Sequence, residues 1–378
     1  MHVLIFSRTY PNAIIAKSGS FVKSQVEALS HHNIKIGVFG VYGISFKYLL
    51  NLQNILNLFS YCFKYDNITE FGFLYPSIPF LKRFNLFIRE QIAKIRFTKY
   101  LKKYGPPDII HLHTFEMGNV ASWIKTKFNI PYMVTEHTSL FSTNSALNFE
   151  IKLAFRTYKN SAFNIAVSKQ FTNFLNKKFN VKFNYLPNFV NTSSFVHSSL
   201  IKNKKIKRFI NVAYLDKNKN QAVLIKAFNK NFKNDKNVKL DIIGNGPEFD
   251  NLKKLIIDLE LKNVNLLGYI ANNKLSEYYN NSDVFVLSSN IETFGVVLIE
   301  AMSCGLPLVS TRSGGPESII ENNKLGYLCK IDEQEDLSNL MLKAMSVNFD
   351  KNYISNYANK YSYKKMSKKL LNIYLKIV

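Results

Sequence analysis

The sequence predicts an α/β protein with two doubly wound domains that face each other across a cleft. Short apolar runs of strand length alternate with helix-length segments almost from end to end, which is the pattern of parallel sheets covered by helices. The length of 378 residues exceeds what one ordinary core needs and suits two domains. Because ligands of such sheets bind where strand order reverses, at the carboxyl ends of the strands, we expect function between the two domains.

Five strands are expected in each half, because each run is short, apolar and followed by a turn or a helix-length segment. In the first half the runs are Val3–Phe6, Lys35–Phe39, Asp108–His111, Tyr132–Thr135 and Phe163–Val167. In the second half they are Phe209–Val212, Lys239–Ile243, Val264–Gly268, Asp283–Leu287 and Leu306–Thr311.

The domain boundary is expected in the polar segment 191–208, which ends in the charged stretch 202–208. The predicted domains are therefore residues 1–195 and residues 196–357. The tail at 358–378 carries apolar residues at helical spacing, Leu370, Ile373 and Leu375, and predicts a closing helix.

Cysteines and the first residues indicate the compartment. Cys62, Cys304 and Cys329 are odd in number and widely spaced, without a Cys-x-x-Cys pair, so neither a disulfide framework nor a zinc site is expected. The N-terminus lacks the basic leader and apolar stretch of a signal peptide. The most apolar long stretch, residues 44–63, is interrupted by Lys47 and several amides and is too polar to span a bilayer. We expect a cytosolic protein.

The chain is strongly basic, and the basic surplus is larger in the first half. The net charge is +24, with 23 Lys and Arg against eight Asp and Glu in residues 1–200, and 27 against 18 in residues 201–378. Such a field attracts anionic membranes, nucleic acids or phosphorylated substrates without choosing among them. The composition, rich in Lys, Asn, Ile, Phe and Tyr, is also what an AT-rich genome produces.

Residues 81–103 predict a basic amphipathic helix. The segment contains eight Lys or Arg and one Glu. Its apolar residues recur at helical spacing: Leu81, Phe84, Ile88, Ile92 and Ile95. Two interpretations stay open, a helix that lies on an anionic leaflet and a helix that packs this stripe on the core with a solvated basic face.

Glu292 and Glu300 flank the start of an apolar helix in the segment 290–315. Gly295 is a natural helix start, and Glu300 lies within the otherwise apolar run 296–302. A buried carboxylate needs a partner. The free backbone N–H groups of residues 294–297 and the positive end of the helix dipole favour an anion such as a phosphate. A phosphate-bearing ligand with hydroxyl groups would satisfy both acids, whereas two solvated glutamates on a surface helix would need no ligand.

This segment resembles the Glu-x7-Glu signature of the GT4 family of retaining glycosyltransferases, from Glu-Thr-Phe-Gly at 292–295 to Glu-Ala-Met-x-Cys-Gly-x-Pro-Leu-Val at 300–309. The resemblance extends over residues 209–328 and implies the GT-B fold, a pair of Rossmann-like domains whose last helix crosses back to the N-terminal, acceptor-binding domain. By this match, Glu300 holds the ribose hydroxyls of a nucleotide sugar and Glu292 contacts the transferred sugar. The backbone at Thr293, Phe294, Gly295 and Val296 would support the pyrophosphate or sugar hydroxyls.

Two further matches lie in the second half. Gly244-Asn-Gly246-Pro247 is a strand-to-helix turn similar to the family turn near the donor base, although such turns also occur without a ligand. Lys219 matches the family lysine that neutralises the donor diphosphate, and Tyr214 stands where the family has an arginine. This departure removes one cation from the leaving-group site, and Lys217 or another cation would have to compensate.

The first half matches at scattered points. Gly19 lies in a loop before a predicted helix, where the family has a glycine loop near the phosphates. His137 follows a predicted strand and matches the family histidine that approaches the donor sugar, whereas a lone histidine is more often structural. His111 and His113 share one face of a strand end, but no third ligand stands at a recognisable spacing, so no metal site is predicted.

The expected function is retaining hexosyl transfer from a nucleotide-diphospho-sugar to a glycan or lipid-linked sugar, without a metal or other cofactor. The resemblance implies bacterial surface polysaccharide synthesis, such as O-antigen or capsule, by a cytoplasmic enzyme with a candidate peripheral contact on the cytoplasmic face of the inner membrane. A nucleotide-sugar epimerase of similar architecture is one alternative. A nonenzymatic basic protein that binds membrane or nucleic acid is another, although no nucleic-acid motif is recognisable in the sequence.

Overall fold

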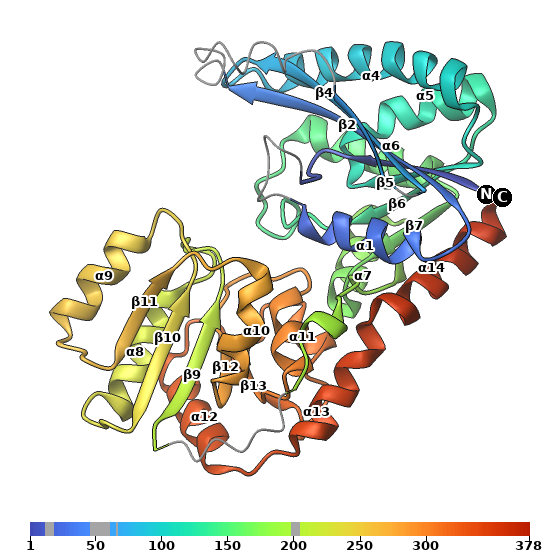
Figure 1. Cartoon of the computed structure of the whole chain (residues 1–378). Coiled ribbons are helices and arrows are strands. Elements are labelled where there is room, and N and C mark those ends of the chain that lie inside the picture. The colour runs from blue at the N-terminus through green and yellow to red at the C-terminus, as the bar shows by residue number, and fades with distance from the viewer. Residues whose placement is uncertain (12–18, 46–60, 66, 198–204) are drawn as a thin grey trace. The chain divides into compact units, whose positions relative to one another are not determined.

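The computed structural model describes residues 1–11, 19–45, 61–65, 67–197 and 205–378 (Figure 1). The chain forms two compact units. Unit 1 comprises Met1–Val167, Thr172–Phe189 and Met366–Val378, and unit 2 comprises Ser168–Phe171 and Val190–Lys365. The expected linker overlaps residues 198–204 and the apolar stretch 44–63 overlaps residues 46–60, both outside the described residues.

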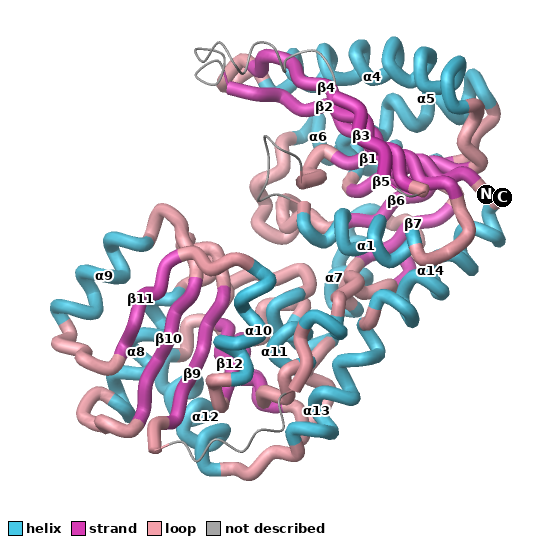
Figure 2. The backbone as a smooth tube through the Cα atoms, viewed as in Figure 1, coloured by secondary structure: helices cyan, strands magenta, loops and turns pink. Residues whose placement is uncertain are grey.

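Unit 1 is built on an eight-stranded sheet of order β3-β4-β2-β1-β5-β6-β7-β8 (Figure 2). Its strands are β1 His2–Ser7, β2 Lys35–Ser45, β3 Tyr61–Tyr65, β4 Ile68–Ser77, β5 Ile109–His113, β6 Tyr132–Glu136, β7 Phe163–Ala166 and β8 Asn184–Tyr185. All six residues of β1 are buried, since helices cover both faces of the sheet.

One expectation about this sheet is wrong. We predicted only parallel strands, but β3 pairs antiparallel with β4, with Cys62 opposite Phe71. Neither strand was predicted from the sequence. The sequence of β4, Ile-Thr-Glu-Phe-Gly-Phe-Leu-Tyr-Pro-Ser, mixes polar and glycine residues with apolar ones, and Thr69 and Glu70 are nevertheless buried beside β2. Sequence patterns identify buried strands by their apolar residues, so a strand that buries polar residues is not recognised.

Helices cover both faces of the unit 1 sheet. Figure 1 shows α4 and α5 on one face and α1 and α14 on the other. The helices are α1 Ser20–Ser30, α4 Lys82–Tyr104, α5 Gly118–Phe128, α6 Asn148–Asn160, α7 Lys169–Phe179 and α14 Tyr363–Ile377. The last helix contributes to the packing of unit 1, because Tyr374 is fully buried and its hydroxyl lies 2.6 Å from Nδ1 of His111.

Unit 2 is built on a six-stranded parallel sheet of order β11-β10-β9-β12-β13-β14. Its strands are β9 Lys207–Val212, β10 Val238–Ile243, β11 Val264–Gly268, β12 Val284–Leu287, β13 Leu308–Thr311 and β14 Gly326–Cys329. Its helices are α8 Gln221–Phe232, α9 Phe249–Asp258, α10 Asn272–Asn280, α11 Val296–Ser303, α12 Gln334–Ser346 and α13 Lys351–Ala358. Phe209, Leu224 and Phe228 lie in a core shared by the sheet and α8.

Strand order reverses once in each sheet, beside β1 in unit 1 and beside β9 in unit 2. Doubly wound sheets collect functional groups at the carboxyl ends of the strands next to such points. The two-domain α/β prediction is confirmed. Functional residues are therefore expected in the loops after β1, β5 and β6 in unit 1 and after β9, β10 and β12 in unit 2.

Helix α4 does not bury the stripe expected from its spacing. Its buried residues are Arg89, Glu90, Ala93, Phe97 and Tyr100. Of the predicted stripe, Leu81, Phe84 and Ile95 are 50%, 46% and 59% exposed, whereas Ile88 and Ile92 are half-buried. Core packing therefore does not explain the three exposed members of this stripe. Among the described residues, no helix combines the length and the hydrophobicity needed to cross a membrane.

Candidate active site

The signature acids of unit 2 lie on the loop between β12 and α11 and on α11 itself. The loop is fixed by its backbone: the Glu292 N–H donates to the Ser313 carbonyl at 2.8 Å, and the Gly315 N–H donates to the Glu292 carbonyl at 2.6 Å. Gly295 caps α11 with a φ of 100°, and a Cβ atom there would lie 2.9 Å from the Leu298 side chain. The glycine is thus required for the chain to enter the helix directly after Glu292.

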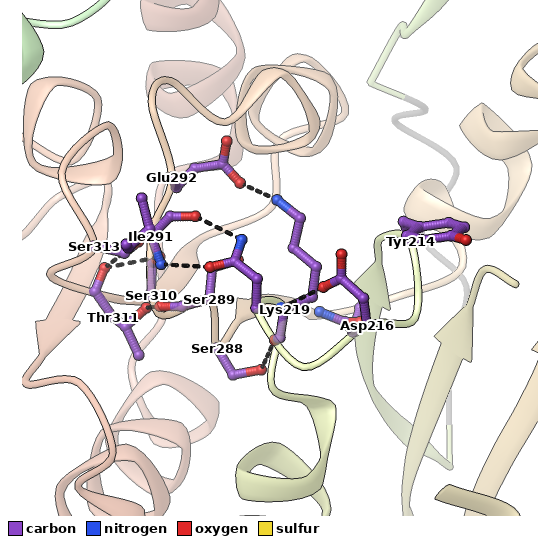
Figure 3. A network of polar contacts seen from close by, with 12 residues as sticks. Tyr214, Asp216, Lys219, Ser288, Ser289, Ile291, Glu292, Ser310, Thr311 and Ser313 are labelled. Carbon is purple, nitrogen blue, oxygen red and sulfur yellow. Dashed lines mark hydrogen bonds and ion pairs between the residues drawn. The ribbon is translucent and has the colours of Figure 1, made fainter. Parts of the chain in front are cut away.

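Lys219 forms an ion pair with Glu292 (Figure 3). The two side chains are 22% and 14% exposed, so the pair is largely removed from water. The loop after β9 holds the lysine in place, because the Lys219 N–H donates to Asp216 Oδ1 at 2.9 Å and the Ser288 hydroxyl donates to the Lys219 carbonyl at 2.9 Å. Two residues that the sequence separates by 73 positions, and that we predicted for one site, are thereby brought together.

Glu300 is buried within α11 at 7% exposure. Burial raises its pKa to about 7, and a hydrogen bond from Tyr279 opposes this effect. The Tyr279 hydroxyl donates to Glu300 Oε2 at 3.0 Å from α10. The sequence predicted the burial and the need for a partner, but not Tyr279, because nothing in the local spacing links α10 to α11.

The turn at Gly244, Gly246 and Pro247 follows β10 as predicted. A Cβ atom on Gly244 would lie 1.8 Å from the Ala213 carbonyl oxygen, and one on Gly246 would lie 2.2 Å from the Leu215 carbonyl oxygen. Close backbone packing against the loop after β9 accounts for both glycines. Their contact with a donor base remains a prediction.

Tyr214, which replaces the expected arginine, does not join the charged pair. Its side chain is 60% exposed, and Figure 3 shows it apart from Lys219 and Glu292. Thr293 and Phe294 lie between Glu292 and the helix cap Gly295, Val296 begins α11, and Phe294 is almost fully buried. Burial of Phe294 thus adds to the backbone hydrogen bonds of Glu292 in fixing the segment before α11.

In unit 1, Gly19 and His137 line one cavity of about 210 Å³, together with Arg8, Phe21 and Glu116. Gly19 caps α1 with a φ of 77°. The His137 ring packs against Phe21 at a centroid distance of 4.4 Å. These two predicted residues therefore share one cavity, although the sequence separates them widely.

His137 is one of three neighbouring histidines. Its Nε2 lies 2.9 Å from Nδ1 of His113, so one ring nitrogen donates to the other, and the two rings stack. The pKa of His137 is held well below its usual range, mainly by burial and to a lesser extent by the neighbouring His113. Burial also lowers the pKa of His113 to about 3. Both rings are therefore neutral near pH 7. The third histidine, His111, accepts or donates to Tyr374 and Thr135.

Glu136 fixes the loop that carries His137. Its Oε1 accepts from the backbone N–H groups of His137 and Thr138, both at 2.9 Å, and the Tyr158 hydroxyl donates to its Oε2 at 2.6 Å. The carboxyl is fully buried, and burial raises its pKa to about 7. Sequence reasoning did not single out Glu136, although a glutamate at the end of an apolar strand was a signal that could have found it.

Within the described residues, no group of three or more His, Cys, Asp or Glu side chains is arranged to hold a metal ion. Of the predicted site residues, the structure pairs Lys219 with Glu292 and buries Glu300 in unit 2, and it places the neutral His137 in unit 1.

Family models match most of the chain. The model of glycosyl transferases group 1 matches residues 194–361, and the model of glycosyltransferase family 4 matches residues 57–194. Together they span residues 57–361 of the 378.

Relatives and solved structures agree with these matches. The chain is 27% identical over 281 residues to an alpha-monoglucosyldiacylglycerol synthase of Acholeplasma laidlawii, covering 67% of this chain and 69% of the relative. It is similar to the structure of a sucrose-phosphate synthase from Thermosynechococcus elongatus, with a TM-score of 0.79 and 17% identity over 100% of this chain and 98% of the other. It is also similar to Anabaena Alr3699/HepE in complex with UDP and glucose, with a TM-score of 0.68 and 18% identity over 98% of both chains.

Two Rossmann-like units, each with polar residues at its strand ends, define the class: this is an α/β protein of the GT-B fold. The chain belongs to the GT4 family of glycosyltransferases and is a glycosyltransferase enzyme.

Proposed function

We propose that this enzyme transfers a hexosyl unit from a nucleotide-diphospho-sugar to a hydroxyl of a glycan or lipid-linked sugar, with retention at the anomeric carbon. The observation that carries the proposal is the partly buried Lys219–Glu292 pair next to the start of α11. The buried Glu300 lies within the same helix. A cation, a helix N-terminus and a desolvated carboxylate suit a diphosphate linked to a ribose. Solved structures of the same fold hold such ligands: Anabaena Alr3699/HepE is in complex with UDP, and trehalose-6-phosphate synthase of E. coli is bound with UDP-2-fluoro glucose.

The donor diphosphate would bind at Lys219 and at the backbone N–H groups that begin α11. The Lys219 ammonium group donates to the Glu292 carboxylate in the structure. Donor binding would therefore replace this carboxylate with the diphosphate as the anion that the ammonium group contacts. Glu292 then becomes available to accept a hydroxyl of the transferred sugar. Glu300 would accept the ribose hydroxyls, which supply hydrogen-bond donors to a carboxylate that is otherwise expensive to bury.

In the proposed step, the bond between the anomeric carbon and the diphosphate oxygen breaks while the acceptor oxygen bonds to the same face of that carbon. The acceptor proton passes to the departing diphosphate oxygen. Lys219 and the α11 amides stabilise the charge that develops on the leaving group, and no metal ion or enzyme nucleophile is assigned. His137 is proposed as a contact to the transferred sugar, and its neutral ring suits a hydroxyl partner.

The proposed setting is bacterial surface polysaccharide synthesis on the cytoplasmic side of the membrane, with α4 as a peripheral contact. Exposed Phe84 and Phe87 beside Lys82 and Arg83 support this contact, since apolar side chains flanked by cations favour an anionic leaflet. The family assignment leaves the epimerase and the nonenzymatic alternatives without support, because both matched models describe glycosyl transfer.

Slow transfer of the sugar to water tests the stereochemistry without knowledge of the acceptor. The enzyme is incubated with α-linked nucleotide sugars and the released sugar is followed by proton NMR. We expect the α-anomer to appear first, and Lys219→Met to lower its release by about tenfold or more, because one charge-assisted phosphate contact is lost. Initial release of the β-anomer would contradict retention.

A further inference from the structure

Unit 1 contains a second group of charged residues that the proposed transfer step does not use. They line a cavity of about 340 Å³ beside the first turns of α4. Its cations are Arg8, Lys82 and Arg89, and its acids are Glu116 and Glu150. A cavity wall with three cations and two acids favours an anionic ligand.

The two acids are already engaged by the protein. Glu150 accepts from the backbone N–H of Leu147 at 2.8 Å at the start of α6. Glu116 is shared by two guanidinium groups: Arg8 is ion-paired with its Oε1, and Arg89 Nη1 lies 3.5 Å from its Oε2. One carboxylate cannot neutralise two guanidinium groups, so the cluster keeps a positive charge.

Arg89 is the strongest indication of a missing anion. Its side chain is only 10% exposed, although its contact with Glu116 is a long one. Over the part of the chain that the structure describes, its Nε has no hydrogen-bond partner. A buried guanidinium with incomplete pairing is costly, and a phosphate accepts from several guanidinium donors at once.

This cavity adjoins the cavity that His137 and Gly19 line. The two share Arg8, Phe115, Glu116 and Thr138. A single ligand can therefore extend from the Arg89 cavity to His137 within unit 1.

We infer that the Arg89 cavity binds a phosphate or diphosphate group of the acceptor, while the sugar of the acceptor lies where this cavity adjoins the His137 cavity, next to the transferred sugar that His137 is proposed to contact. This inference rests on the proposed function and adds an anionic group to the acceptor. Glu116 holds the two arginines while the cavity is empty and yields Arg89 to the phosphate when the acceptor binds.

The phosphate has two chemical sources, a lipid-linked glycosyl phosphate and a soluble sugar phosphate. The surroundings bear on this choice, because Lys82 and Arg89 lie on α4, whose same turns expose Phe84 at 46% and Phe87 at 57%. A hydrocarbon chain leaving the phosphate would find these apolar side chains next to the cavity.

Calorimetric titration with glucose 1-phosphate and with glucose tests the site. The Lys219→Met protein is used throughout, so that the proposed donor site does not hold the phosphate. We expect glucose 1-phosphate to bind at least about tenfold more tightly than glucose, and Arg89→Gln to remove this preference. Glu116→Gln should tighten phosphate binding severalfold, since it releases both arginines.

Two further variants keep the test decisive. Arg8→Gln should also weaken phosphate binding, and its side chain is 56% exposed, so it preserves folding if Arg89→Gln does not. Lys99→Gln, on the same helix but outside the cavity lining, is the matched control and should bind as tightly as the parent. Equal binding of glucose and glucose 1-phosphate, or a preference that survives in both arginine variants, would overturn the inference.

Farnesyl phosphoglucose distinguishes the two sources. A further gain of about tenfold over glucose 1-phosphate, lost in Phe87→Ser, identifies a lipid-linked acceptor. Equal binding of the two compounds supports the same cavity with a soluble phosphate. The wild type is also titrated with nucleotide sugars. If no nucleotide sugar binds but phosphate still binds in an Arg89-dependent way, the proposed sugar transfer is contradicted while the proposed anion site is supported.

Discussion

Single residues carry the proposed chemistry through charges that the fold removes from water. Lys219 is ion-paired with the Glu292 carboxylate, and in the proposed binding mode a diphosphate replaces that carboxylate. We predict that Lys219→Met weakens binding of the nucleoside diphosphate by about tenfold to a hundredfold, because a charge-assisted contact is lost. Glu292→Gln should retain or tighten this binding, because Lys219 is released, while turnover falls.

Titration of nucleoside diphosphate into both variants measures these effects. Lys226→Met, an exposed lysine on α8, is the control and should leave binding unchanged. Weaker diphosphate binding by Glu292→Gln than by the wild type would contradict the exchange of anions on Lys219.

The raised pKa of Glu300, about 7, predicts that donor binding depends on pH. In the proposed binding mode the ionised carboxylate would accept both ribose hydroxyls, whereas the protonated form gives up one acceptor. Affinity should therefore fall as pH drops through about 7. The hydrogen bond from Tyr279 lowers the pKa of Glu300, so Tyr279→Phe should move the midpoint to higher pH.

Donor affinity is measured from about pH 5.5 to about 8.5, a range centred on that pKa. The measurement shows whether affinity falls at low pH and whether Tyr279→Phe moves the midpoint to higher pH. Glu300→Gln should remove the dependence, and Tyr278→Phe should leave the midpoint where the wild type has it. A midpoint that moves to lower pH in Tyr279→Phe would show that this hydroxyl does not stabilise the ionised form.

The segment 290–315 predicted Glu292 and Glu300, and the family resemblance predicted Lys219 and His137. The structure brings Glu292 and Lys219 into direct contact. Their partners escaped prediction. Tyr279 reaches Glu300 from another helix, and Arg8 reaches Glu116 across 108 positions of sequence. Such contacts depend on tertiary packing, which no local spacing encodes.

At the scale of elements, α4 combines a basic composition with the exposed aromatic residues Phe84 and Phe87. We predict that Phe84→Ser and Phe87→Ser together lower binding to vesicles containing phosphatidylglycerol by about tenfold or more, because burial of such side chains contributes about 1 to 2 kcal/mol each. The basic residues should make binding sensitive to salt.

Vesicle sedimentation at low and high salt measures this binding. Phe155→Ser, on α6 with 40% exposure, is the matched control. Unchanged sedimentation of the α4 variant, or equal binding to neutral and anionic vesicles, would contradict a membrane contact at α4.

Strands with continuous apolar runs, such as β1 and β12, were predicted from the sequence because both faces of a parallel strand are buried. The strands β3, β4, β8 and β14 were missed. β8 has only two residues, and β4 buries Glu70 within the sheet. The sequence left open whether α4 packs its apolar stripe on the core, and in the structure Arg89 and Glu90 are buried while Phe84 is exposed. Tertiary context overrode the periodicity in each case.

For the whole molecule, the central claim is that unit 2 binds a nucleotide-diphospho-sugar through Lys219, the start of α11 and Glu300. The overall architecture followed from the alternation of elements, and the ligand class followed from the signature acids together with the family match. The donor base and sugar depend on side chains around the ligand rather than on the shared fold.

The most direct test is a thermal-shift panel of UDP-, GDP- and CMP-sugars, with and without Mg²⁺, on the wild type and on Glu300→Ala. A ligand that binds only the folded state raises the unfolding temperature. We predict that one nucleotide sugar raises this temperature without Mg²⁺, and that the increase disappears in Glu300→Ala. A shift of equal size in wild type and variant, or no shift with any nucleotide sugar, would contradict the proposed donor site.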